Sequence, residues 1–229
     1  MTCYSIPDHV YLYLDDACAV WLDVRKDEYI GQPREALYGL QGWVKDWPAD
    51  PPSDTPFPDP ARTLIELEQQ GLITSGYSAK GAVLAKMAEP KFDFVDETEN
   101  FRVRPRQILS ALLAYRRAKR ALSSLEGAVA RVRCLKQRPH SPSKDGIPDL
   151  QAHVKAFMRL RRGLYDVKQN CLFDSLCAFE FLATLGIYPN FVIGIQTNPF
   201  TAHAWVQDGE YVLNDYALRV RYYSPILVV

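Results

Sequence analysis

Three residues in the last third of the chain have the types and the order that nucleophilic catalysis requires. Cys171 begins a segment with helical periodicity, His203 lies in a strand-like segment, and Asp215 ends the next one. A thiol attacks a carbonyl as its thiolate, a neighbouring imidazole returns the proton, and a carboxylate orients that imidazole. The spacing therefore predicts Cys171, His203 and Asp215 as a catalytic set.

Cys171 is the cysteine best placed to ionise. A helix N-terminus carries roughly half a positive charge and free N–H groups, which lower the pKa of a thiol and can bind an oxyanion. Cys177 lies deeper in the same predicted helix, about 240° around its axis, and is interpreted as a core residue. Gln169 and Asn170 could donate to an oxyanion, although a helix N-cap role explains Asn170 equally well.

His203 is the only histidine in an apolar, strand-like setting, and Trp205 lies two residues beyond it. If the turn is centred on residues 208–209, the hairpin register places His203 opposite Asn214 and diagonal to Asp215. A one-residue bulge would bring Asp215 directly opposite. Asn214 is therefore a second candidate for orienting the imidazole, and Trp205 is expected to shield or support it.

The elements that must position these residues predict an α+β protein with two modules. Three strand signals and two helical stretches give a small winged-helix-like module over residues 1–76, with a polar linker over 77–104. Residues 105–229 predict helices followed by antiparallel strands. The predicted elements are Val10–Leu14, Ala17–Asp23, Glu28–Ile30, a helix after Pro33, Ala61–Gln70, Pro105–Cys134, a helix carrying Leu150 to Leu160, Cys171–Leu185, 190–195, 202–206, 211–215 and an edge strand within 221–229.

Composition narrows the class of protein. The chain has 229 residues, 48% of them hydrophobic, and a net charge of zero, which is typical of a globular protein. Five scattered cysteines without a CxxC pair predict free thiols and no metal site. The amino terminus lacks the features of a signal peptide, and no apolar run reaches about 18 residues, so we expect a cytoplasmic protein without a membrane span.

Charge is divided unevenly along the chain. Residues 1–100 carry 8 Lys and Arg against 18 Asp and Glu, whereas residues 101–170 carry 17 against 4. The division indicates either solvated helix faces or surfaces that meet a charged partner. The basic stretch lacks interleaved aromatic residues, so we expect no nucleic-acid binding.

The segments 170–176, 200–206 and 214–215 resemble the catalytic region of transglutaminase-like cysteine peptidases. More narrowly, they are similar to the leader peptidases of lasso peptide biosynthesis, the B proteins, and residues 10–30 resemble the precursor-recognition domain of that family. Asp174 departs from the small or basic residue expected at its position and would raise the pKa of the Cys171 thiol.

The resemblance implies a bacterial cytoplasmic protease in which residues 1–76 bind the leader of a ribosomally made precursor and residues 105–229 cut leader from core. Tyr29 and Ile30 lie on the third strand, at an edge that could pair with an extended peptide, or they cover the module's own core. Leu64 and Leu67 are further candidates for leader contact. No cofactor is implied in this chain. ATP would be used by the partner, an asparagine-synthetase-like cyclase, because the chain has no GxxxxGK[ST] loop.

Two alternatives stay open at this point. One is an acyl or amine transferase with the same transglutaminase-like fold, which the absence of an Arg-Gly-Gly run before Cys171 disfavours. The other is a non-catalytic scaffold that binds the precursor, which the Cys171, His203 and Asp215 set disfavours. Faster alkylation of Cys171 than of Cys134 would separate an activated thiol from a scaffold.

Overall fold

The computed structural model describes residues 3–50, 57–76, 81–95, 102–137, 147–167 and 170–229. The chain divides into two compact units, Met1–Ala85 and Lys86–Val229. Each unit is described by itself. The linker predicted over 77–104 spans this division, and part of it lies outside the described residues, as does much of the loop predicted between Trp47 and Pro60.

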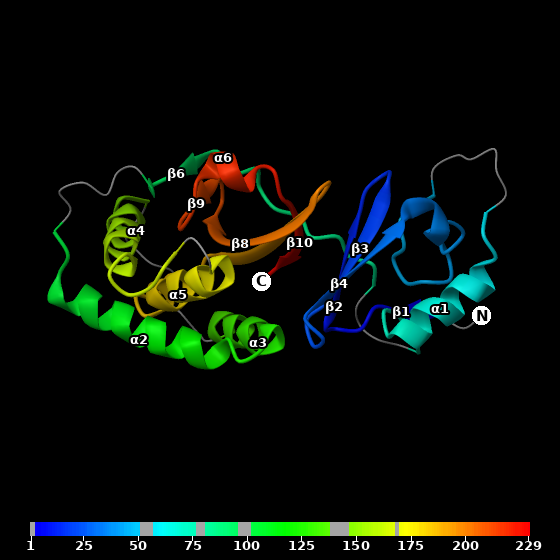
Figure 1. Cartoon of the computed structure of the whole chain (residues 1–229), viewed down its shortest axis with the longest axis horizontal. Coiled ribbons are helices and arrows are strands. Elements are labelled where there is room, and N and C mark those ends of the chain that lie inside the picture. The colour runs from blue at the N-terminus through cyan, green and yellow to red at the C-terminus, as the bar shows by residue number, and fades with distance from the viewer. Residues whose placement is uncertain (1–2, 51–56, 77–80, 96–101, 138–146, 168–169) are drawn as a thin grey trace. The chain divides into compact units, whose positions relative to one another are not determined.

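The first unit is built on a three-stranded antiparallel sheet in the order β2–β3–β4 (Figure 1). Its strands are β2 (Val10–Leu14), β3 (Cys18–Asp23) and β4 (Glu28–Pro33). The turns between β2 and β3 and between β3 and β4 are each stabilised by an aspartate, whose side chain accepts hydrogen bonds from the backbone N–H groups that follow it. Asp15 accepts from the N–H of Ala17 at 2.8 Å and of Cys18 at 2.7 Å, and Asp23 accepts from Arg25 at 2.9 Å. The predicted meander is confirmed.

Two helical segments complete this unit. Helix α1 (Pro60–Gln70) begins at Asp59, whose side chain accepts from Ala61 N–H, and it ends at Gly71, where φ is 77°. Only a 3-10 turn, η1 (Arg34–Leu37), follows the sheet, so the longer helix predicted after Pro33 is wrong. Short strands β1 (Tyr4–Ser5) and β5 (Thr74–Ser75) pair antiparallel. The core gathers Trp21, Leu37, Leu40, Leu64, Leu67 and their neighbours.

The second unit contains a five-stranded sheet in the order β10–β7–β8–β9–β6. Its central pair, β7 (Asn190–Thr197) and β8 (Phe200–Asp208), forms a long antiparallel hairpin. Strand β10 (Ser224–Val228) lies at one edge, as predicted for the tail, and pairs with β7. Short strands β9 (Tyr211–Val212) and β6 (Phe92–Asp93) complete the other side. The predicted order of helices followed by antiparallel strands is confirmed.

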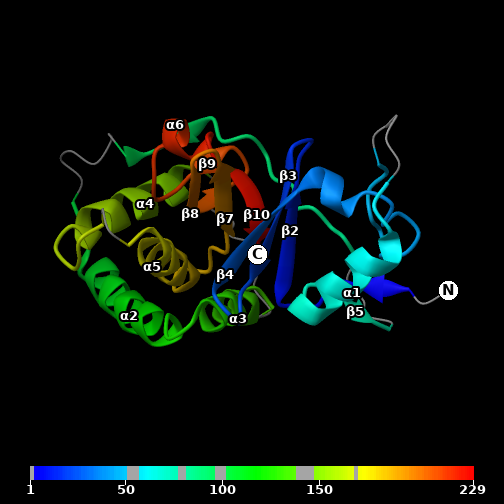
Figure 2. The same ribbon diagram turned by 45° about the vertical axis from the view of Figure 1, so that its right-hand side comes forward.

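Helix α5 (Cys171–Ala183) lies between helix α2 (Pro105–Ala121) and the sheet, and Figures 1 and 2 show this layering from two directions. α5 contacts α2 on one side and β8 on the other. Because it is covered on both sides, nine of its 13 residues, Asp174–Leu182, are buried, as expected for a helix inside a core. The other helices are α3 (Leu125–Lys136), α4 (Ile147–Arg161) and α6 (Ala217–Val220).

The single helix predicted over Pro105–Cys134 is wrong, because the chain forms α2 and α3 instead. Ser124 is the N-cap of α3, and its hydroxyl accepts from the N–H of Gly127. A serine that caps a new helix ends the preceding one. The buried face of α2 is formed by alanines with Gln107, whereas Ile108, Leu109 and Leu112 are exposed.

Gly194 on β7 allows the Trp205 ring to pack closely against the backbone of that strand. It pairs with His203 across β7 and β8. A Cβ atom at this position would lie 2.7 Å from the Trp205 ring and 3.0 Å from Tyr223 Cβ. The indole therefore occupies the space that a side chain on β7 would take.

Replacing Gly194 with alanine should lower the free energy of unfolding of the second unit by about 1–3 kcal/mol, because the Trp205 ring must move within a packed core. Gly163→Ala is the matched control: its Cβ would meet nothing closer than 3.6 Å, so a change below about 0.5 kcal/mol is expected. Urea unfolding measures both. Equal effects for the two variants would contradict the packing described here.

Candidate active site

Cys171 is the first residue of α5, as the sequence predicts. It is partly buried, and the His203 side chain and the backbone N–H groups of Ala204 and Leu172 stabilise its thiolate. Asn170 holds the N-cap position without a side-chain capping bond. The helix N-terminus and the strand thus both direct donors at the sulfur.

His203 lies between the thiol and a carboxylate. Its Nε2 is 2.6 Å from Asp215 Oδ2, which leaves Nδ1 for the thiol of Cys171. Both the imidazole and the carboxylate are largely buried, with side chains 11% and 12% exposed. The three predicted residues are therefore brought together in the order thiol, imidazole, carboxylate.

These contacts shift the three pKa values together. Burial by itself raises the pKa of the Cys171 thiol, but the bonds from His203 and Ala204 outweigh it and leave that pKa below its ordinary value. Burial opposes the charged imidazole too, yet the bonds to Asp215 and Cys171 raise the pKa of His203 to about 9. The pKa of Asp215 is lowered despite burial, because His203 and the Tyr216 N–H stabilise its carboxylate. The arrangement favours a thiolate–imidazolium pair near neutral pH.

The strand register that brings Asp215 to His203 differs from the predicted one. Asp208 pairs with Tyr211, so the turn lies at residues 209–210 and the predicted pairing of His203 with Asn214 is wrong. β9 ends at Val212. Beyond it, the side-chain oxygen of Asn214, in place of a backbone carbonyl, accepts a hydrogen bond from the Val206 N–H at 2.7 Å. The chain then turns away from β8 at the point where Asp215 meets the imidazole.

Asn214 belongs to a buried polar network that joins this segment to two helices. Its amide donates to Asp174 Oδ2 at 2.9 Å and to Ser175 Oγ at 3.0 Å. Arg161 Nη1 donates to the same Asp174 oxygen at 2.5 Å and to the Asn214 carbonyl at 2.7 Å. Tyr165 donates to the other Asp174 oxygen at 2.8 Å. The network therefore fixes the residue next to Asp215.

Asp174, which was expected to raise the pKa of the Cys171 thiol, forms an ion pair with Arg161. Burial raises the pKa of its carboxyl, while Arg161 and the bonds from Asn214 and Tyr165 act in the opposite direction. The thiol of Cys171 keeps a lowered pKa with this carboxyl one turn away. Asp174 is thus a structural partner of Arg161.

Aromatic rings enclose the imidazole. The ring centroids of His203 and Trp205 are 6.3 Å apart, with an angle of 18° between the planes, and Tyr223 lies 5.1 Å from His203. Trp205 is fully buried, and its Nε1 donates to Gln207 at 2.9 Å. These rings limit access of water to one side of His203.

The catalytic candidates open onto a cleft of about 700 Å³ within the second unit. The volume is in the range of pockets that bind drug-sized ligands. Side chains from α4, α5, β8 and the segment after β9 line it, including Arg162, Tyr165, Tyr216, Arg219 and Tyr223. Cys171 is therefore accessible to a ligand bound in this cleft.

The remaining predicted residues are placed as follows. Gln169 lies outside the described residues, and Asn170 is exposed beside Cys171. Tyr29 and Ile30 are half-buried on β4, at an edge of the first sheet. Leu64 and Leu67 are 2% and 1% exposed in the core of the first unit, so their side chains offer no surface to a peptide.

Several residues of the site were missed in the sequence. Arg161 ends α4, Tyr165 follows that helix, and Tyr223 lies in the tail. Arg219 Nη1 is 3.5 Å from both Asp215 carboxylate oxygens. One signal was available for Arg161: an aspartate on a largely apolar helix requires a buried cation or donor. Over the described ranges, no group of three His, Cys, Asp or Glu side chains could hold a metal ion.

Iodoacetamide should alkylate Cys171 well below the ordinary pKa of a thiol, about 8.5, because its thiolate is stabilised. At about pH 6.5 we expect it to react at least ~10-fold faster than the exposed Cys134. His203→Ala should remove this difference, since burial alone raises the thiol pKa. Mass spectrometry of the labelled peptides measures both rates. Equal rates in the wild-type protein would rule out an activated thiol.

Arg161→Met should cost about 3–5 kcal/mol of unfolding free energy, because it leaves the Asp174 carboxylate buried without its cation. Adding Asp174→Asn should recover part of that loss, since the uncompensated charge is then gone. Denaturant unfolding of the two single variants and the double variant gives the coupling. Strictly additive losses would mean that the pair makes no energetic contribution as a pair.

In the part of the chain that the structure describes, no helix is both long and apolar enough to cross a membrane. No curated protein and no solved structure matches the chain. The family model of the transglutaminase-like superfamily matches residues 112–228, slightly more than half of the 229 residues. The match covers Cys171, His203 and Asp215, and this superfamily generally carries cysteine-protease-like catalysis, which is consistent with a peptidase or a transferase. The chain therefore belongs to the transglutaminase-like superfamily.

Proposed function

We propose that this protein is a cysteine peptidase that removes the leader from a ribosomally synthesised lasso peptide precursor. The observation that carries the proposal is a thiol with a lowered pKa, beside a hydrogen-bonded His203–Asp215 pair at the wall of a cleft of about 700 Å³. The resemblance of residues 10–30 and of the catalytic segments to lasso leader peptidases supports the choice of substrate.

Cleavage would proceed in two steps. The Cys171 thiolate attacks the scissile carbonyl carbon and forms a C–S bond, and N–H donors at the start of α5 face the developing oxyanion. His203 gives its proton to the leaving amine as the C–N bond breaks, which releases the core. Water then attacks the thioester, His203 accepts its proton, and the leader leaves as a carboxylic acid.

Leader binding is assigned to the first unit. Strand β4 has one paired edge, against β3, and forms an outer strand of its sheet. An extended leader could add there as a further strand, with Tyr29 and Ile30 beside it. The released core would pass to a separate cyclase of the asparagine-synthetase-like type, which would supply the ATP-dependent step. The site is expected to work in the bacterial cytoplasm.

The direct test is mass spectrometry of a leader-core precursor, encoded in a neighbouring reading frame, after incubation with the protein, the cyclase and ATP. We expect cleavage at one junction by the wild-type protein and a rate at least about 10³-fold lower for Cys171→Ala, which lacks the nucleophile. Cys177→Ala is the matched control. Cys177 is buried away from the cleft, so this variant should still cut.

Binding measured with the same proteins separates the alternatives. Leader binding without cleavage by either protein would favour a precursor-binding scaffold. A product in which an added amine has replaced the released core would favour acyl transfer, which this superfamily also permits. Absence of both binding and cleavage would overturn the assignment of the first unit as a leader-recognition domain.

A further inference from the structure

Helix α2 has a cluster of exposed hydrophobic side chains on its outward face. Twelve large hydrophobic side chains are exposed among the described residues, and four of them fall within six residues of α2. These are Ile108, Leu109, Leu112 and Leu113, which are 44%, 60%, 45% and 38% exposed. Single exposed leucines are ordinary, but a cluster on one helix marks a surface that another molecule covers.

The opposite side of α2 already meets the needs of the fold. Ala111, Ala114 and Ala118 are buried, and α2 packs against α5 and α4 within this unit. Small side chains allow the helices to approach closely. The four large residues lie outside this buried face, and the packing of α2 against α5 and α4 gives no reason for their exposure.

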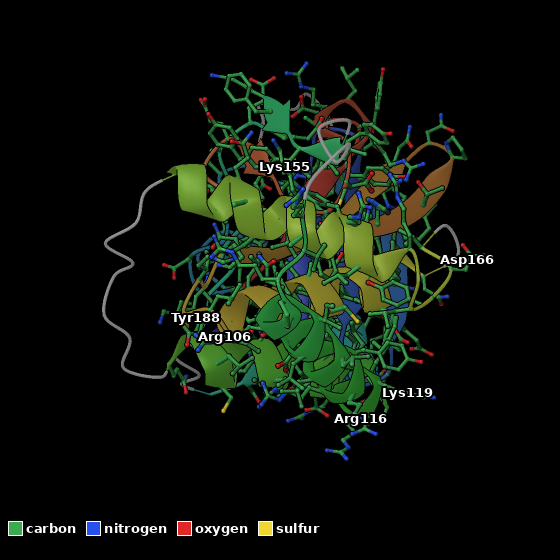
Figure 3. The ribbon with its side chains drawn as sticks, turned by 90° about the vertical axis from the view of Figure 1, so that its left-hand side faces the viewer. Arg106, Arg116, Lys119, Lys155, Asp166 and Tyr188 are labelled. Carbon is green, nitrogen blue, oxygen red and sulfur yellow. The ribbon has the colours of Figure 1, made fainter. Side chains whose placement is uncertain are left out.

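The C-terminal half of the same face is basic. Pro105–Ala121 contains five Lys and Arg residues and no Asp or Glu. Arg116 and Lys119 project from the helix in Figure 3. Both residues and Arg120 are exposed. Two basic residues in the last turn are explained by the helix dipole, but Arg116 and the apolar cluster are not.

The apolar and basic halves follow each other along the helix. Residues four positions apart lie on one face, so Ile108, Leu112, Arg116 and Arg120 form one row. A helix that lies in a membrane surface keeps its apolar and basic residues on different sides over its whole length. Here, burying Leu112 in lipid would bring Arg116 toward the acyl chains, so the pattern favours a protein partner.

We propose that the outward face of α2 is the docking site for a partner protein that presents an amphipathic helix with exposed leucine-type residues beside glutamates or aspartates. The leucines would cover Leu109 and Leu112, and the carboxylates would pair with Arg116 and Lys119. A second copy of α2 fits poorly, since it carries no acidic residue. This surface is separate from the catalytic cleft and does not depend on the proposed peptidase activity.

The probe is a synthetic helix of about five turns, with leucines in its middle turns and glutamates in the flanking ones, so that it can dock in either direction. A control peptide has lysines in place of the glutamates. Fluorescence anisotropy with the full chain should show binding of the glutamate peptide that weakens as salt is raised. Binding of the lysine peptide should be at least about tenfold weaker.

Variants of the protein test the two halves separately. Leu109→Asp with Leu112→Ser should weaken binding of the glutamate peptide at least ~tenfold. Arg116→Glu with Lys119→Glu should reverse the preference, so that the lysine peptide binds better. Tyr222→Asp, at a position 72% exposed in the same unit, is the control and should bind as the wild type does. Circular dichroism checks that each variant is folded.

Three results would overturn the proposal. The first is equal binding of the two peptides by the wild-type protein. The second is co-sedimentation with phosphatidylcholine–phosphatidylglycerol vesicles that Leu109→Asp abolishes, which would make the face a lipid-binding surface. The third is self-association in light scattering that the same substitution removes, which would make the occupant a second copy of this chain.

Discussion

An imidazole can exchange a proton with a thiol only while its ring is held in one orientation, and the hydrogen bond between His203 Nε2 and Asp215 Oδ2 supplies that restraint. The rest of the second unit is arranged around it. The bond requires Asp215 to leave the sheet just after β9 and to face back toward β8. Since a loop carboxylate has many orientations, the segment before it must be fixed by other means.

That segment is fixed by buried polar groups. The Asn214 side chain replaces a backbone partner of Val206, while Asp174 and Arg161 bind the Asn214 amide and carbonyl. A buried ion pair gives little net stability, because desolvation opposes the attraction. Its effect here is geometric: helices α4 and α5 hold the residue adjacent to Asp215. Because α5 also carries Cys171, the thiol and the carboxylate are positioned by one rigid element.

The same arrangement explains the electrostatics of the site. Desolvation disfavours every charged form in the site, and the mutual contacts of Cys171, His203 and Asp215, together with neighbouring backbone N–H groups, reverse that effect. The thiol is therefore activated by its partners and by the N-terminus of α5 together. For Cys177, six residues further along α5, burial and the nearby Asp174 carboxylate raise the pKa of the thiol and outweigh the contact with Tyr165.

The sequence by itself determined the α+β class, the three-stranded first sheet, and the order of Cys171 at a helix start, His203 in a strand and Asp215 after the following turn. Local periodicity, turn residues and the chemistry of each side chain are sufficient for these. Tertiary structure decided the register after residue 208, the division between α2 and α3, the burial of Leu64 and Leu67, and the pairing of Arg161 with Asp174. Each of these depends on groups distant in the chain: a side chain can substitute for a strand, and burial depends on which face a neighbouring element covers.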